Sequence, residues 1–179
     1  MAEKFRNRYR SKTIRLPGYD YSSNGAYFVT ICIRKKIQYL GTIINGKLIL
    51  SDSGIIVQKC WLEIPSHFSN TSLDDFVIMP DHMHGIIIIN SNLNSSPETP
   101  KLVVSTSCVT GNPYWKPNSL GSIINQFKRI CTIETKSIGS EISWQPRYYD
   151  HIIRSDNELY RVRSYITNNP GTWLIDDYG

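Results

Sequence analysis

The sequence predicts a single α+β domain in which strands and helices alternate along the chain. Three observations indicate this class. Residues 26–33 are an aromatic and β-branched run typical of a buried strand, Asn45-Gly46 between apolar stretches is a strong hairpin signal, and a capped segment with a helical apolar period begins at Ser155. The 179 residues, 40% of them hydrophobic, suffice for one domain with a sizeable core.

Composition excludes several classes of protein. The cysteines lie far apart and form no CxxC pair or zinc-type spacing, which favours ordinary buried thiols in a reduced compartment. No apolar run reaches membrane-spanning length and the N-terminus lacks an apolar signal core, so we expect a soluble, cytoplasmic protein. The net charge of +5 suits a polyanionic partner without establishing one.

The N-terminal segment, residues 1–16, is a basic arm. It has two interpretations: a solvated tail, or an arm that lies along a phosphate backbone. Leu16-Pro17-Gly18 then breaks the chain before regular structure begins. The basic residues of the arm are Lys4, Arg6, Arg8, Arg10, Lys12 and Arg15.

The first half of the chain contains five segments of strand character and one of helical character. Ser51 or Asp52 is placed to cap the helix, and Pro65 is expected to end it. Pro80-Asp81 separates the last two strands. The expected strands cover residues 26–33, 39–44, 47–50, 73–79 and 83–90, and the helix covers about 54–64.

The second half begins with a change of composition. Residues 91–118 are rich in Ser, Asn, Thr and Pro and are interpreted as a long loop or insertion. A helix follows from Ser119 to about Lys136, with Lys128 and Arg129 on its polar side, and residues 144–153 form an extended segment.

The last helix has the clearest signals. Ser155 at the N-cap and Glu158 at N3 form a capping box, and Pro170-Gly171 is expected to end the helix. Its apolar stripe consists of Leu159, Val162 and Ile166. On another strip Tyr165 and Asn169, four residues apart, lie one above the other, and Arg161 lies one turn before Tyr165.

His82 and His84 are the candidate metal ligands. Side chains alternate faces along a strand, so both imidazoles should point the same way while Met83 points the other way. Two imidazoles on one face can share a divalent metal ion. For the pair alone, the default interpretation is one surface and one half-buried histidine at the entrance of a strand, and other residues must support a metal site.

Three blocks of this sequence resemble the His-hydrophobic-His ("HUH") single-tyrosine transposases, in particular the REP-associated tyrosine transposases related to insertion-sequence transposases. The blocks are residues 76–85 around the histidine pair, residues 144–154 and residues 165–170. The resemblance spans about residues 17–90 and 119–173 in the order of the family. Asp81 departs from it, because many members have Asn or Glu there, and adds an acid beside the metal site.

The resemblance implies a ferredoxin-like antiparallel sheet with helices on one face, the HUH nuclease fold. It implies Tyr165 as the nucleophile and His82, His84 and Asn169 as ligands of Mg²⁺ or Mn²⁺. It further implies cleavage and rejoining of single-stranded DNA through a 5′-phosphotyrosine, at hairpin-forming palindromic repeats, by a nucleoid-associated bacterial protein that is a monomer or a homodimer.

Other aromatic and basic residues also have candidate roles. Tyr148 and Tyr149 are rival nucleophiles, which we expect on a strand as base-stacking or core aromatics. His151 is expected to pack or to touch phosphate, with a metal role as the alternative. Besides the N-terminal arm, the expected DNA-binding residues are Lys128, Arg129, Arg147, Arg154 and Arg161.

Two other functional classes stay open. A non-catalytic single-stranded nucleic-acid-binding protein needs only a sheet, aromatic side chains and a basic arm. A replication-initiator or relaxase-type nickase shares the histidine pair, but such enzymes generally carry a third ligand elsewhere and have longer chains. Metal-dependent nicking distinguishes an enzyme from a binder, and a rejoined strand distinguishes a transposase from a nickase.

Overall fold

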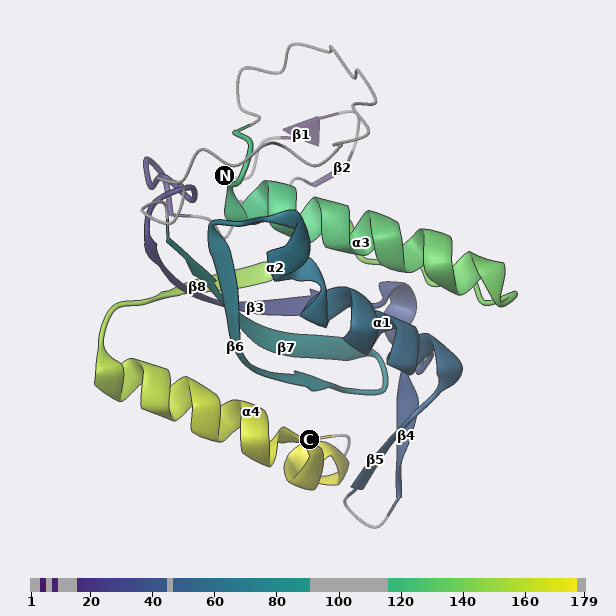
Figure 1. Cartoon of the computed structure of the whole chain (residues 1–179). Coiled ribbons are helices and arrows are strands. Elements are labelled where there is room, and N and C mark those ends of the chain that lie inside the picture. The colour runs from purple at the N-terminus through teal and green to yellow at the C-terminus, as the bar shows by residue number, and fades with distance from the viewer. Residues whose placement is uncertain (1–3, 6–7, 10–15, 45–46, 91–115, 177–179) are drawn as a thin grey trace.

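A four-stranded antiparallel sheet forms the centre of the protein in a computed structural model of the chain, which describes residues 4–5, 8–9, 16–44, 47–90 and 116–176. The strand order is β6-β7-β3-β8, so the first strand of the sheet lies between the third and the fourth (Figure 1). This is the order of the ferredoxin-like split βαβ arrangement, and the expected α+β class is confirmed. The sheet strands are β3 (Gly25–Cys32), β6 (Thr71–Ile78), β7 (His82–Ile89) and β8 (Tyr149–Ile153).

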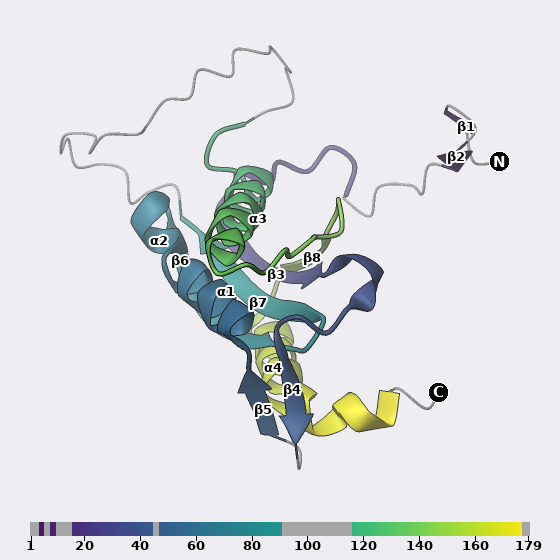
Figure 2. The same ribbon diagram turned by 90° about the vertical axis from the view of Figure 1, so that its right-hand side faces the viewer.

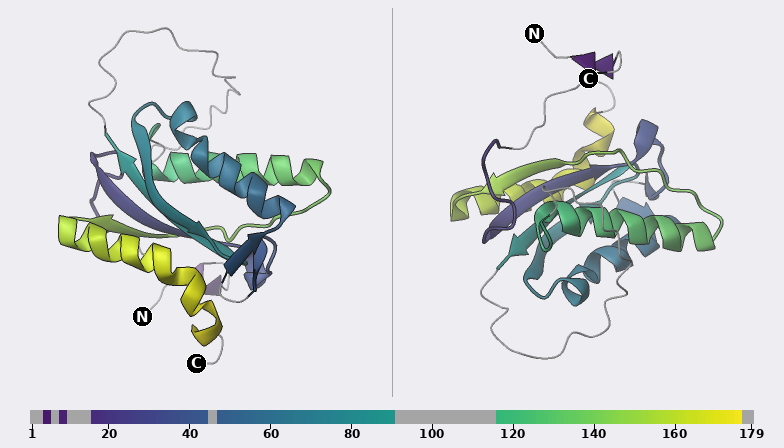
Figure 3. Two further views of the ribbon diagram at one scale, coloured as in Figure 1. Left: turned by 60° about the horizontal axis from the view of Figure 1, so that its bottom comes forward. Right: turned by 90° about the horizontal axis from the view of Figure 1, so that it is seen from above.

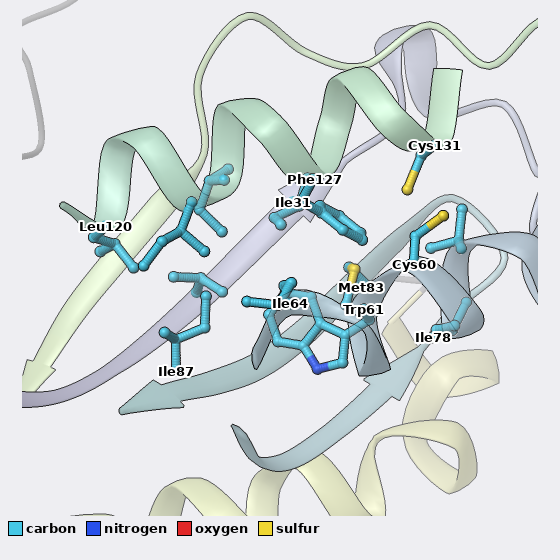
Figure 4. Close-up of a cluster of buried hydrophobic side chains, with 14 of the residues drawn as sticks. Ile31, Cys60, Trp61, Ile64, Ile78, Met83, Ile87, Leu120, Phe127 and Cys131 are labelled. Atoms are coloured by element: carbon cyan, nitrogen blue, oxygen red, sulfur yellow. The ribbon is translucent and has the colours of Figure 1, made fainter. Parts of the chain in front are cut away.

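Helices α1 and α3 cover one face of this sheet (Figure 2). Along β3 the core-facing residues are Tyr27, Val29 and Ile31, each fully buried, and β7 contributes Met83 and Ile87 to the same face. Trp61 and Phe127 from the two helices meet over these strands with ring centroids 5.4 Å apart (Figure 4). The helices are α1 (Asp52–Leu62), α2 (Ile64–His67), α3 (Leu120–Ser137) and α4 (Asp156–Asp176).

Helix α4 lies on the opposite face of the sheet (Figure 1). Its apolar stripe, Leu159, Val162 and Ile166, packs in a small second cluster with Phe28 of β3 and Ile86 of β7. The expectation of helices on one face is therefore correct for α1 and α3 and wrong for α4. The period-2 pattern of the strands allows both arrangements, because each strand also has an apolar residue on its second face.

The two prolines expected to end helices differ in outcome. Helix α1 ends at Leu62, close to the expected end before Pro65, and Pro65 itself lies in the first turn of the short helix α2, where a missing N–H leaves no intrahelical bond unmade. Pro170 lies inside α4, which continues to Asp176. The helix changes direction near its C-terminal end (Figure 3), as expected for a proline in the ladder of hydrogen bonds.

The remaining elements largely follow the prediction. The expected hairpin is formed by β4 (Gly41–Ile44) and β5 (Lys47–Leu50), and Ser51 and Ser119 cap α1 and α3. Only the last five residues of the extended segment 144–153 form a strand. The insertion up to residue 115 lies outside the described residues, as do Arg6, Arg10, Lys12 and Arg15 of the arm. Lys4 and Arg8 of the N-terminal arm belong to two short paired strands, β1 (Lys4–Phe5) and β2 (Arg8–Tyr9).

Ser155 caps α4 as expected, since its hydroxyl accepts a hydrogen bond from the Glu158 N–H at 3.3 Å. Glu158 reaches one residue further back than a capping box requires, and accepts from the N–H of Arg154 at 2.7 Å. Its second oxygen accepts from His151 Nε2 at 2.6 Å. The start of α4 is thereby tied to β8 at the edge of the sheet.

Within the described part of the chain, no helix combines the length and the apolar character needed to cross a membrane.

Candidate active site

The two histidines lie at the beginning of β7, on the face that α4 covers. Strand β7 starts at His82, one residue earlier than predicted, so both histidines have extended backbone. Their Nε2 atoms are 3.1 Å apart, whereas Met83 between them is fully buried on the core face. The expected common orientation of the pair is confirmed.

Each histidine has a polar partner on its Nδ1 atom. His82 Nδ1 donates to the buried carboxylate of Asp81 at 2.6 Å. His84 Nδ1 is 2.8 Å from Thr30 Oγ1 on the neighbouring strand β3. A hydroxyl both donates and accepts, so Thr30 can satisfy either tautomer of His84. Both rings are therefore oriented with their Nε2 atoms toward the same point.

Burial controls the charge of His84. Its side chain is 5% exposed and stacks on Phe28, with ring centroids 5.4 Å apart. Burial in the first place, and the neighbouring His82 in the second, lower the pKa of His84 to about 3. The imidazole is therefore neutral at physiological pH, which is the form that ligates metal ions.

Tyr165 of α4 meets this pair. Its hydroxyl is 3.3 Å from His84 Nε2, although 81 residues separate the two in sequence. The ring packs edge-on against His84 and Phe28, with centroids 5.2 and 6.0 Å apart. Tyr165 is nevertheless 51% exposed. The buried His84, the partly buried His82 and the half-exposed Tyr165 therefore share one site.

Asn169 and Trp173 continue the strip of α4 that carries Tyr165, at steps of four residues. Tyr165 contacts His84, and Trp173 contacts His82 with ring centroids 5.6 Å apart. Asn169, one turn from each, therefore faces the same histidine pair, and it is only 7% exposed. Because the helix continues past Pro170, it reaches His82 as well as His84.

These residues fit a divalent metal ion. With each Nδ1–H donated to its partner, the two Nε2 lone pairs face each other at 3.1 Å, an arrangement that a shared cation stabilises. Asp81 contacts Nδ1 of His82, the ring nitrogen that does not face His84, and so fixes the orientation of the ring. Among the described residues, no cluster of three or more His, Cys, Asp or Glu side chains is arranged to hold a metal ion. The candidate donors that the sequence predicts, two imidazoles and the amide of Asn169, lie outside that definition because it does not count an amide.

The rival tyrosines have different surroundings. Tyr148 packs against the main core, with the ammonium of Lys128 5.8 Å from its ring centroid. Tyr149 lies on the α4 face, 43% exposed and edge-on to Phe28. His151 is bound to Glu158 beyond Tyr149 on the same strand. Tyr165 is the tyrosine that the structure places with its hydroxyl against His84.

The basic residues expected to bind DNA are divided between the two faces. Lys128 donates to the carbonyl oxygens of Gln145 and Arg147, at 2.8 and 3.1 Å, and burial lowers its pKa to about 8. It holds two segments together on the core side instead of lying free on the polar side of α3. Arg129 is exposed on the same helix. Exposed positions near Tyr165 and β8 are occupied by Arg147, Arg154 and Arg161.

Sequence reasoning missed Thr30, Phe28 and Trp173. Thr30 and Phe28 reach His84 through the pairing of β3 with β7, whose register is not encoded locally. Trp173 has a local signal, because it follows Asn169 by four residues, but Pro170-Gly171 predicts that the helix ends before it.

A Haemophilus influenzae protein described as uncharacterised is 38% identical to this chain over 167 residues, covering 92% of this chain and 91% of the relative. No model of a known protein family matches the chain. A solved structure of a REP-associated tyrosine transposase bound to a REP hairpin has the same fold, with a TM-score of 0.57 at 20% identity, and the match covers 90% of this chain and 73% of the other.

Proposed function

We propose that this chain, which belongs to one family with its Haemophilus influenzae relative, is a metal-dependent transposase that cleaves and rejoins single-stranded DNA. The observation that carries the proposal is the hydroxyl of the half-exposed Tyr165, 3.3 Å from His84 Nε2, with a second histidine beside it. The fold shared with a REP-associated tyrosine transposase supports it.

In this proposal His82, His84 and Asn169 hold Mg²⁺ or Mn²⁺. When bound, the ion stabilises the negative charge that develops on the non-bridging oxygens of a phosphate under attack. Asp81 and Thr30 fix the orientation of the two imidazoles through their Nδ1 atoms. Loss of either partner should weaken the site without removing a ligand.

Tyr165 supplies the nucleophile. Its oxygen forms a bond to the scissile phosphorus while the bond from phosphorus to the 3′ oxygen breaks. The tyrosine loses its proton and the departing 3′ oxygen takes one up, so the products are a 5′-phosphotyrosine and a free 3′-hydroxyl. The covalent bond conserves the phosphodiester, and a second 3′-hydroxyl can displace the tyrosine to give a rejoined strand without ATP.

The proposed substrate is single-stranded DNA beside a hairpin, handled in the cytoplasm. The related transposase structure contains a REP hairpin. Arg161 is exposed one helical turn before Tyr165, Arg154 is exposed just before the start of α4, and the chain carries a net charge of +5. Cations placed around an accessible nucleophile favour the approach of a phosphate backbone.

Tyrosine-to-phenylalanine variants test the proposal. Each variant is incubated with end-labelled single-stranded hairpin DNA and Mn²⁺, and covalent adducts are separated on a denaturing gel. Tyr165→Phe keeps the ring and its packing but should form no adduct, whereas Tyr148→Phe and Tyr149→Phe should retain it. An adduct present in Tyr165→Phe and absent in Tyr149→Phe would identify Tyr149 as the nucleophile.

The same assay separates the remaining functional classes. Binding without an adduct in the unmodified protein would indicate a non-catalytic single-stranded DNA-binding protein. An adduct that never yields a rejoined strand, when a second oligonucleotide with a free 3′-hydroxyl is added, would indicate a nickase. Chelation of the metal should abolish the adduct while binding persists.

A further inference from the structure

We infer that Tyr149 and Trp173 are base-stacking residues that receive unpaired nucleobases on two sides of the scissile phosphate. This inference rests on the proposed function, because it takes Tyr165 as the point at which the strand is cut. It assigns two nucleobase subsites beside the histidine pair, one on the sheet and one on α4.

Tyr149 reaches the site across the sheet. It pairs with Thr30 of β3, and Thr30 pairs on its other side with His84 of β7, so the three residues form one row perpendicular to the strands. At the usual strand spacing Tyr149 lies about 10 Å from His84. One edge of its ring contacts Phe28, yet 43% of the residue is exposed.

Trp173 reaches the site from a different direction. It lies two helical turns after Tyr165, about 12 Å along the axis of α4. Its ring is inclined by 37° to that of His82 and the side chain is only partly buried. His82 precedes His84 along β7, so Trp173 flanks the pair along the strand direction whereas Tyr149 flanks it across the strands.

Nucleobases are the occupants that this arrangement fits. Single-stranded DNA that presents one phosphate to Tyr165 must carry a base on each side of that phosphate, and those bases have no partner strand. Partly exposed aromatic rings stack on any base, whereas the positive charge of the arginines near β8 and α4 suits the phosphates of the backbone. Tyr148, the neighbour of Tyr149, shows the contrast, because its ring packs in the main core.

The test compares two oligonucleotides with the same phosphates: a deoxythymidine 16-mer and an abasic 16-mer. Binding is measured by fluorescence anisotropy in EDTA, so that it does not depend on metal or cleavage. The unmodified protein should prefer the strand that has bases. Tyr149→Ala and Trp173→Ala should each reduce this preference by roughly 5- to 150-fold, the range for loss of one stacked base.

Three controls accompany these variants. Tyr149→Phe and Trp173→Phe keep an aromatic ring and should retain most of the preference. Tyr160→Ala removes an aromatic side chain that is 73% exposed on α4 but has no ring contact with the site, and should change nothing. Circular dichroism of each variant establishes that it is folded.

The outcomes separate this inference from the proposed function. A base preference that survives both Tyr149→Ala and Trp173→Ala overturns the stacking role, whatever the adduct assay shows. An equal loss in Tyr160→Ala overturns it as well, because the effect would not belong to the site. A protein that binds neither oligonucleotide contradicts the proposed function and the stacking residues together.

Discussion

The two faces of the central sheet are built from the same strands and have opposite properties. On one face β3 and β7 present Tyr27, Val29, Ile31 and Met83, all fully buried under α1 and α3. On the other face the alternate residues of those strands include Thr30, His82 and His84. The core face contains most of the buried apolar side chains, whereas the second face combines a small apolar cluster with the polar site.

This difference shows how one short sequence serves two purposes. In His82-Met83-His84 the middle residue is buried in the core and the outer residues meet at Nε2. Burial of apolar surface is the dominant favourable term in folding, so the core face can hold the strands in place while polar residues occupy the other. Substitutions on the core face should therefore affect mainly stability, and those on the second face mainly chemistry.

The largest stability effect should come from Trp61→Ala. Trp61 is fully buried between α1 and the sheet, so its removal leaves a cavity that costs about 3–5 kcal/mol. Urea unfolding followed by circular dichroism measures the loss. The matched variant is Trp173→Ala on the second face, where the side chain is partly exposed and the loss should be much smaller. Equal losses would contradict the division between the faces.

Gly85→Ala should have the next largest effect. A Cβ at Gly85 would overlap the ring of Trp61, which is fully buried and would have to shift within the core. Overpacking of this kind costs about 1–3 kcal/mol. Gly171→Ala is the control, since a Cβ there meets nothing within 4 Å and alanine favours a helix by up to about 1 kcal/mol. If Gly171→Ala were destabilised and Gly85→Ala were as stable as the unmodified protein, contact with Trp61 would not be the reason for a glycine at position 85.

Local periodicity was sufficient to predict part of this site. The common face of His82 and His84 follows from the period of a strand, and the strip from Tyr165 to Asn169 follows from the period of a helix. The resemblance to a transposase family predicted that these two segments contribute to one site. The contact between Tyr165 and His84 could not be derived from either period, because it depends on how α4 packs on the sheet.

The missed features depend on long-range pairing or on exceptions to local rules. Thr30 contacts His84 across 54 residues, and a shift of one residue in the register would place it on the other face. Pro170 is usually a stop signal, yet α4 continues past it and brings Trp173 to His82. The position of α4 on the second face likewise needed the packing of Ile166 against β3 and β7.

Two neighbouring residues of β3 allow one chemical exchange to be made on both faces. Val29→Thr places a hydroxyl in the apolar core, without a partner, and should cost about 1–3 kcal/mol. Thr30→Val removes the hydroxyl that contacts His84 Nδ1 and should lower adduct formation about 10- to 100-fold, with a smaller change in stability. Urea unfolding and the adduct assay are carried out on both variants. If Val29→Thr lowered adduct formation and Thr30→Val lowered stability, the assignment of stability to the core face and of chemistry to the second face would be wrong.

The smallest effect concerns the attachment of α4 to the sheet. Arg163, two residues before Tyr165, donates from Nε to Asp74 Oδ1 at 2.9 Å and from Nη2 to Oδ2 at 2.5 Å. Asp74 lies in β6 where the register with β7 shifts, and its side chain is 10% exposed against 46% for Arg163. Because the arginine is substantially exposed, the pair should contribute only about 0.2–1 kcal/mol.

The pH dependence of stability measures the contribution of the Arg163–Asp74 ion pair. The hydrogen bonds from Arg163 lower the pKa of Asp74 below 3.8, so the pair stabilises the folded state above that pH and its contribution is lost as the pH falls through the folded pKa. Asp74→Asn keeps an oxygen for the Asp75 N–H but removes the charge. Unfolding free energies of the two proteins should therefore differ at pH 7 and converge as the pH falls below 3.8. A difference that stays constant over this range would mean that packing, and not the charge of Asp74, holds α4 and its tyrosine over the histidine pair.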